Sequence, residues 1–328
     1  MMLPLTPQVF RRTELEQLAV PTLLHSVWAK NNEVHIIPYA VGVNGSMLLH
    51  NLDHLSAAGI DPKSLTTLDA IVGAATKLVR REGGTITRAG LLLSHTPNYL
   101  YDWVLDQGAK FYDEKTGKWS WQTAEAERAL QWLVDLYDKH AVTWRTAPPG
   151  VANALGEGHA SMALHGAYAL SGFAASHKDT KLADQPLPAF VASKQPTYYL
   201  PEISGFALSA LRKPDDPQTK VGAALYRELY SPEGAMALAN EYTGAILLKG
   251  MYTDPRFKDT RFGAARAKFT EQVVSKTVMI NSIAADATPL LTATFNKVLA
   301  GELSVKAALA DLQQTVSVKE EEALRARG

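Results

Sequence analysis

Hydrophobic and polar positions follow two kinds of spacing along the chain, and together they predict a mixed α/β protein. Residues 34–43 are mostly apolar and β-branched, which is typical of a buried strand with Pro38 at an edge or a break. Shorter strands are predicted at residues 160–164 and 206–211, each set off by glycine. Segments with helical spacing lie between these strands, and this interspersion favours an α/β fold.

Two helices are predicted most clearly. Residues 68–80 carry apolar side chains on one helical face, Thr66 or Thr67 can cap the start, and Gly83-Gly84 is expected to end the helix. Thr123 opens a second helix with acidic residues in its first turn.

Three further helix starts are predicted from capping residues. Asp216-Pro217 and Ser231-Pro232 each place a capping side chain before a proline suited to the first helical turn. Ser304 is expected to cap the last helix, and residues 319–328 to form a charged, frayed tail.

The segment of residues 35–62 reads as a strand, a polar break rich in small residues, a short apolar run and a capped helix. This order is typical of a chain that crosses between two lobes.

With 328 residues and 46% hydrophobic content, the chain is long enough for two globular units. Lys plus Arg and Asp plus Glu both number 33, so no net charge favours binding to nucleic acid.

The search for catalytic and metal-binding motifs is mostly negative. His50 and His54 could share a helical face, but Asn51 stands where a metalloprotease helix has its glutamate. Gly156-Glu-Gly158 lacks the third glycine of a dinucleotide motif, and cysteine is absent. We therefore expect no metal, no cofactor and no enzymatic activity. A carbohydrate-acting enzyme with a carboxylate pair stays open as an alternative, as does a sensory or interaction protein.

Several aromatic side chains stand beside Gly, Asn, Ser or Pro, where flat rings can line a cleft. Tyr39, Trp103, Tyr168 and Tyr242 are of this kind. A sugar presents apolar C–H faces and a ring of hydroxyls, so its site needs exposed aromatic faces and hydrogen-bonding groups. The chain has both near the same breaks.

A series of short motifs, in order along almost the whole chain, resembles one family. Ile36-Ile37-Pro38-Tyr39 is similar to the family's Gly-Leu-Pro-Tyr strand, and residues 154–168 resemble its Phe-x-x-Gly-Lys-Ala-Ala-Met-x-x-x-Gly-x-Trp. Residues 203–208 resemble its second crossing, and residues 299–304 a closing helix start. The family is that of the extracellular solute-binding proteins of ABC importers, in the group of sugar binders that includes maltose-binding protein.

The resemblance implies a two-lobed periplasmic-binding-protein-like fold of type II. Lobe 1 would comprise residues 1–44 and 207–278, and lobe 2 residues 45–206 and 279–328. A sugar or oligosaccharide would bind between the lobes and draw them together by a hinge motion that membrane permeases detect. The protein would act as a monomer in the periplasm or another extracytoplasmic space. Polyols or glycerol phosphates remain alternative solutes.

The resemblance also implies a set of ligand-binding residues. Tyr168 stands at the family's stacking tryptophan, Glu202 is a candidate acceptor for sugar hydroxyls, and four small polar residues are candidate hydrogen-bonding partners. The full set is Tyr39, Asn44, Ser46, Trp103, Tyr168, Glu202, Ser204, Gly205, Tyr242 and Asn281.

The N-terminus departs from the family pattern. Family members begin with a signal sequence and several elements of lobe 1, and this chain starts after them, with neither a signal peptide nor an anchor cysteine. Either the start is assigned downstream of the true one or the gene is truncated. We expect the first lobe to be incomplete and residues 1–328 to bind sugar weakly or not at all.

Overall fold

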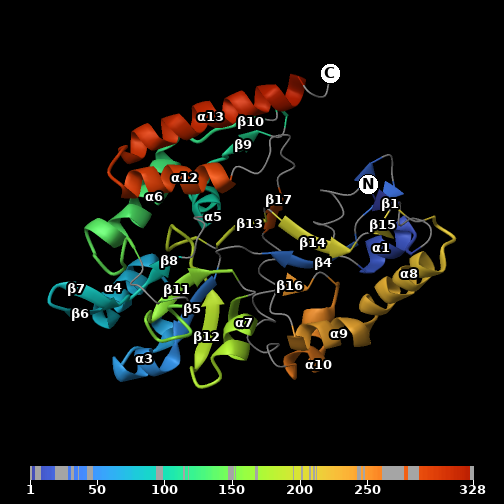
Figure 1. Ribbon diagram of the computed structural model, residues 1–328, viewed down its shortest axis with the longest axis horizontal. Coiled ribbons are helices and arrows are strands. Elements are labelled where there is room, and N and C mark those ends of the chain that lie inside the picture. Colours follow the sequence, from blue (N-terminus) through green and yellow to red (C-terminus); the bar gives the residue numbers. More distant parts are fainter. Residues whose placement is uncertain are drawn as a thin grey trace. The chain divides into compact units, whose positions relative to one another are not determined.

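The computed structural model divides the chain into two compact units, which are shown in Figure 1. Unit 1 is Met1–Val43 with Leu200–Asn281, and unit 2 is Asn44–Tyr199 with Ser282–Gly328. The lobe boundaries expected from the sequence stay a prediction. The structure describes residues 2–3, 9–18, 29–30, 33–35, 37–42, 47–93, 99–113, 115–116, 118–146, 151, 153–166, 169–194, 196–200, 202–206, 208–209, 211, 213–241, 245–246, 248–260, 277–279 and 288–325.

Unit 1 contains a three-stranded antiparallel sheet with the order β14, β4, β16. These strands are β14 (Glu202–Phe206), β4 (Ile37–Gly42) and β16 (Ala245–Ile246). Shorter pairs join β1 (Met2–Leu3) to β15 (Leu208–Ser209) and β2 (Ala29–Lys30) to β3 (Glu33–Val34). The other elements are α1 (Arg12–Leu18), α8 (Pro217–Leu229), α9 (Pro232–Glu241), η2 (Met251–Thr253), α10 (Pro255–Lys258) and β17 (Thr277–Met279).

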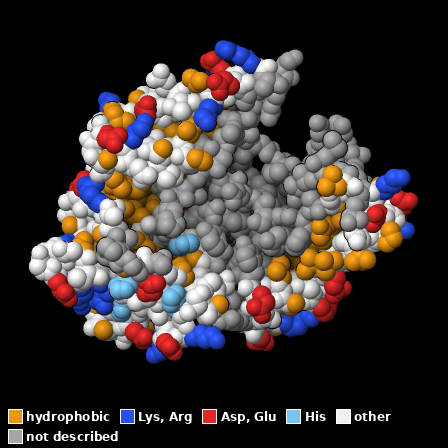
Figure 2. Space-filling model, in the orientation of Figure 1, with side chains coloured by type: hydrophobic (Ala, Val, Ile, Leu, Met, Phe, Trp, Pro, Cys, Tyr) orange, Lys and Arg blue, Asp and Glu red, His pale blue; other side chains and the backbone are white. Residues whose placement is uncertain are grey.

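The helix starts predicted in unit 1 are confirmed. The Asp216 carboxylate accepts a hydrogen bond from the Gln218 N–H at 2.8 Å, and the Ser231 hydroxyl accepts one from the Gly234 N–H at 3.0 Å. α9, η2 and α10 pack around a small apolar cluster of Ala235, Ala239, Met251 and Phe257. Hydrophobic side chains also show over α8 in Figure 2, where Val221 and Leu225 are exposed.

Unit 2 is built on a four-stranded mixed sheet with the order β12, β5, β11, β8. These are β12 (Leu182–Pro186), β5 (Met47–Asn51), β11 (Met162–His165) and β8 (Leu92–Leu93). Every residue of β5 is buried, because strands flank it on both sides and helices pack against the sheet. Two hairpins are formed by β6 (Arg80–Glu82) with β7 (Thr85–Arg88) and by β9 (Tyr112–Asp113) with β10 (Lys118–Trp119).

The helices of unit 2 begin where capping residues predict them. Thr67 caps α4 by accepting from the Ala70 N–H, and Thr123 caps α6 by accepting from the Ala126 N–H, both at 3.1 Å. The remaining elements are α3 (Leu52–Ala57), η1 (Pro62–Ser64), α4 (Leu68–Leu78), α5 (Tyr99–Asp106), α6 (Ala124–Asp138), α7 (Ala169–Ser176), α12 (Thr288–Leu299) and α13 (Val305–Arg325). Strand β13 (Tyr198–Leu200) continues across the boundary into unit 1.

Two local predictions are wrong. Gly83-Gly84 does not end α4; both glycines have positive φ and form the turn of the β6–β7 hairpin, after the helix has ended at Leu78. Residues 319–325 are not frayed, since α13 continues to Arg325. The buried Glu320 carboxylate fixes this end of α13 by accepting the Trp119 N–H at 2.9 Å.

Candidate functional site

Strands β4 and β14 of unit 1 bring together predicted site residues that are far apart in the sequence. Ser204 pairs with Ala40 and Gly205 with Pro38, so one residue of β4, Tyr39, has no opposite partner. This register shift is a bulge-type irregularity at Tyr39, referred to below as the bulge. Bulges are common next to binding and active sites, where they redirect side chains out of the regular alternation of a strand.

Glu202 lies at the start of β14 and pairs with Gly42, the last residue of β4. Four of the predicted ligand-binding residues therefore lie on two hydrogen-bonded strands: Tyr39, Glu202, Ser204 and Gly205. We refer to these four residues as the β4–β14 group. Their convergence follows from strand pairing between segments more than 160 residues apart, which spacing along the chain does not show.

The remaining predicted residues do not join this group in the part of the chain that the structure describes. Asn44, Ser46, Tyr168, Tyr242 and Asn281 lie outside the described residues.

Trp103 lies on α5 in unit 2 and is only 1% exposed. Its ring packs against Tyr99 at 5.3 Å, Trp132 at 4.9 Å and Phe190 at 5.8 Å between ring centroids. In this arrangement both faces of the indole are covered by protein. Trp103 is thus a core residue. Contact with a sugar would require an exposed face of its ring, and the described structure has none.

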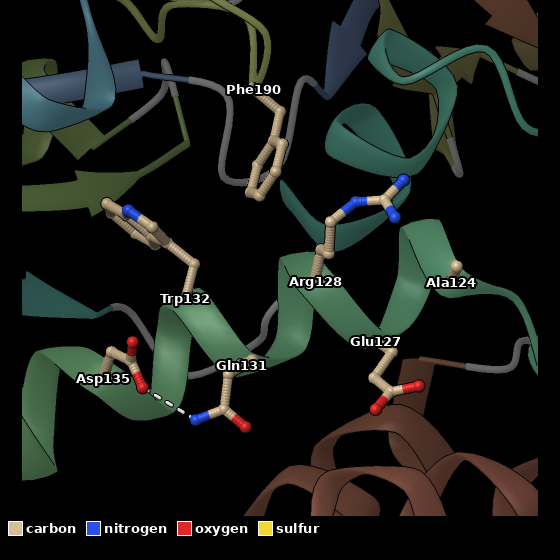
Figure 3. Close-up of a pocket in the computed structure, with 7 residues that line it drawn as sticks. All are labelled: Ala124, Glu127, Arg128, Gln131, Trp132, Asp135 and Phe190. Carbon is tan, nitrogen blue, oxygen red and sulfur yellow. Dashed lines mark hydrogen bonds between the residues drawn. The ribbon is translucent and has the colours of Figure 1, made fainter.

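Two neighbours of Trp103 do offer aromatic surface, and the sequence analysis missed both. Trp132 and Phe190 are half-buried and line a cavity of about 560 Å³ on unit 2, which Figure 3 shows. The other lining residues are Ala124, Glu127, Arg128, Gln131 and Asp135 of α6. Trp132 could have been found from its position beside, rather than within, the apolar stripe of its helix.

The C-terminal end of α5 holds one wall of this cavity. The buried Asp106 carboxylate accepts the Phe190 N–H at 3.0 Å and the Thr197 N–H at 2.6 Å. Burial raises the pKa of Asp106 to about 6, although these hydrogen bonds favour the charged form. Asp106 therefore anchors the loop between β12 and β13 and is an unsuitable half of a glycosidase pair, since both its oxygens bind the backbone.

The two histidines considered for a metal site are in different elements. His50 is buried in β5, where desolvation lowers its pKa to about 4, and His54 lies on α3 with its Nδ1 3.1 Å from the Ser161 Oγ. Desolvation, with Arg88 nearby, also lowers the pKa of His54. Histidine side chains gather over α3 in Figure 2. Over the described ranges, no three His, Asp or Glu side chains group so as to hold a metal ion.

Among the helices of the described ranges, none combines the length and apolar character that crossing a bilayer requires.

Comparison with known proteins adds a family match. A family model described as bacterial extracellular solute-binding protein matches residues 11–262. The arabinooligosaccharide-binding protein of Halalkalibacterium halodurans is 32% identical over 176 residues, which are 50% of this chain and 37% of that protein. The chain thus matches little more than a third of this curated relative's length.

Solved structures share the fold. The maltose/maltodextrin-binding domain from Bdellovibrio bacteriovorus bound to maltotriose has a TM-score of 0.76 at 18% identity, covering 99% of this chain and 80% of that one. The cyclic α-maltosyl-1,6-maltose binding protein from Arthrobacter globiformis has a TM-score of 0.74 at 17% identity, covering 98% and 80%. The predicted type II periplasmic-binding-protein-like α/β fold is confirmed by these similarities.

Proposed function

The chain belongs to the family of bacterial extracellular solute-binding proteins, and from this premise we propose that it binds a sugar or oligosaccharide for an ABC importer. The family is one of binding proteins and not of enzymes. The relatives described above are named for arabino-oligosaccharides, maltotriose and a cyclic maltosyl-maltose, which favours an oligosaccharide over a small ion or an amino acid.

The observation that carries the proposal is the bulge at Tyr39 opposite Ser204 and Gly205. The paired strands bring together the residue types that a sugar ring requires: an aromatic residue, a hydroxyl-bearing serine, a glycine and an acidic residue. We assign ligand contacts to this β4–β14 group. We also retain Asn44, Ser46, Tyr168, Tyr242 and Asn281 from the sequence as proposed contacts, and no longer Trp103, which is buried.

The proposal extends to partners and location. The protein would deliver its ligand to membrane permeases through the hinge closure expected from the sequence, in which ligand increases the population of a closed form. It would work outside the cytoplasmic membrane, in keeping with the extracellular designation of its family, and as a monomer. It would bind no nucleic acid, because positive and negative side chains are equal in number.

Titration of the chain with maltotriose and arabino-oligosaccharides, followed by intrinsic fluorescence, tests the proposal. We expect a saturable change at high sugar concentration, in keeping with the weak binding expected from the sequence, with unaltered sugar recovered by chromatography. Tyr39→Ala is expected to weaken binding about tenfold or more, since a stacking ring is lost. Tyr226→Ala on α8, the matched control in unit 1, is expected to bind as the unaltered chain does.

Two results would count against the proposal. Release of shorter sugars would indicate a carbohydrate-acting enzyme. No response to any sugar, together with capture of a protein partner, would indicate a sensory or interaction protein.

A further inference from the structure

The cavity that Figure 3 shows belongs to unit 2, whereas the β4–β14 group belongs to unit 1. We call it the α6 cavity, with the lining residues given above. Its volume of about 560 Å³ falls within the range of small-molecule sites. Its lining combines two aromatic rings with amide, guanidinium and carboxylate groups.

The aromatic walls of the α6 cavity are held in place from behind. Trp132 packs edge to face on the buried Trp103, with ring centroids 4.9 Å apart. Phe190 packs on the same Trp103 at 5.8 Å, and its N–H is bound by the Asp106 carboxylate at 3.0 Å. In Figure 3 Phe190 extends toward the side of α6 from which Trp132 and Arg128 project. Both rings are thus fixed before any ligand arrives, which lowers the entropy lost on binding.

Arg128 is also held, and its charge is balanced. Its Nε donates to Gln107 Oε1 at 2.8 Å and its Nη2 to Glu125 Oε1 at 2.8 Å. Gln107 is fixed in turn by the backbone oxygens of Trp103 and Glu125. These contacts leave Nη1 of Arg128 as a donor without a hydrogen bond to any residue that the structure describes.

The charge of the α6 cavity favours a neutral ligand. Glu125 neutralises Arg128, while Glu127 and Asp135 add negative charge to the lining. A phosphate or carboxylate would therefore be repelled. A neutral ring with apolar C–H faces and hydroxyl groups would stack on Trp132 and Phe190 and accept hydrogen bonds from Arg128.

We propose that the α6 cavity is a second carbohydrate-binding site, for one or a few neutral sugar rings. It would act independently of the β4–β14 group and would hold a separate sugar chain.

Indole ¹H–¹⁵N resonances of protein labelled at tryptophan test this proposal. Trp132→Phe, which keeps an aromatic ring, assigns the Trp132 signal. We expect this signal to move saturably on titration with maltotriose or an arabino-oligosaccharide. Phe190→Ala is expected to raise the dissociation constant about tenfold. Lys139→Ala, just beyond α6 and outside the cavity lining, is expected to leave it unchanged.

The test separates this site from the main one. A Trp132 response that persists in Tyr39→Ala supports an independent site even if the β4–β14 group binds nothing. The proposal is overturned if the Trp132 signal stays still with every sugar. It is overturned equally if the response disappears in Tyr39→Ala, or if it is unaltered in Phe190→Ala with native circular dichroism.

Discussion

Asp106 is predicted to make the stability of the protein depend on pH in a defined direction. Its carboxyl is only 3% exposed, and burial raises its pKa from 3.8 to about 6. Because the pKa in the folded state is raised, the favourable contribution of the protonated form is fully present below about pH 3.8. It is lost as the pH rises through about 6. At neutral pH the folded chain therefore holds a charge that burial disfavours.

The size of the effect follows from the two pKa values. Their separation corresponds to about 2–3 kcal/mol of free energy of unfolding between pH 4 and pH 8. Asp106→Asn removes the charge and keeps an oxygen that can accept from Phe190 or Thr197. As the pH rises from 4 to 8, the free energy of unfolding of the variant relative to the unaltered chain should therefore increase by about 2–3 kcal/mol.

Urea denaturation followed by tryptophan fluorescence measures this difference. Five of the six tryptophans, all except Trp28, belong to unit 2, so the signal reports the unit that contains Asp106. Asp53→Asn, at a side chain 56% exposed, is the matched control and should change stability by tenths of a kcal/mol at every pH. If the difference between Asp106→Asn and the unaltered chain is the same from pH 4 to pH 8, the assignment of a raised pKa is refuted.

Other perturbations have equally defined outcomes. Burial lowers the pKa of His50 to about 4. The contribution of His50 to the free energy of unfolding should therefore fall by about 3 kcal/mol as the pH drops from 6.5 to 4. In urea titrations, His50→Gln should not show this pH-dependent decrease. Glu320→Ala should lower the free energy of unfolding by about 1–3 kcal/mol, since it leaves the Trp119 N–H without its partner; an unchanged urea midpoint would contradict this contact. Gly90→Ala should destabilise strongly in thermal melts, because a Cβ there would lie 2.0 Å from the Ala75 oxygen. Gly73→Ala, in open space on α4, should instead add about 1 kcal/mol, and equal effects of the two glycine changes would contradict the packing described.

Local rules predicted helix starts well because each depends on a few neighbouring atoms. Thr67, Thr123, Asp216 and Ser231 cap helices as their side chains indicate. The end of the chain was predicted less well. Glu320 stabilises α13 by a contact with a residue 201 positions away, and no local pattern encodes such a contact.

The candidate site shows the same division between local and distant effects. An aromatic beside a proline could be noted from the sequence, but the bulge at Tyr39 arises from its pairing with a distant strand. Trp103 and Trp132 are both tryptophans on helices, and the site prediction named the one that is buried. Which of two neighbouring rings keeps an exposed face depends on the packing of α5, α6 and the loop that carries Phe190.

Calorimetric titration of the chain with maltotriose and with arabino-oligosaccharides tests the central claim most directly. The account predicts saturable heat from at least one of these sugars. The part of this heat that comes from the β4–β14 group should be markedly weakened in Tyr39→Ala and Ser204→Ala and unaffected in Tyr226→Ala. Absence of saturable heat with every sugar, or heat that is identical in Tyr39→Ala, would contradict it.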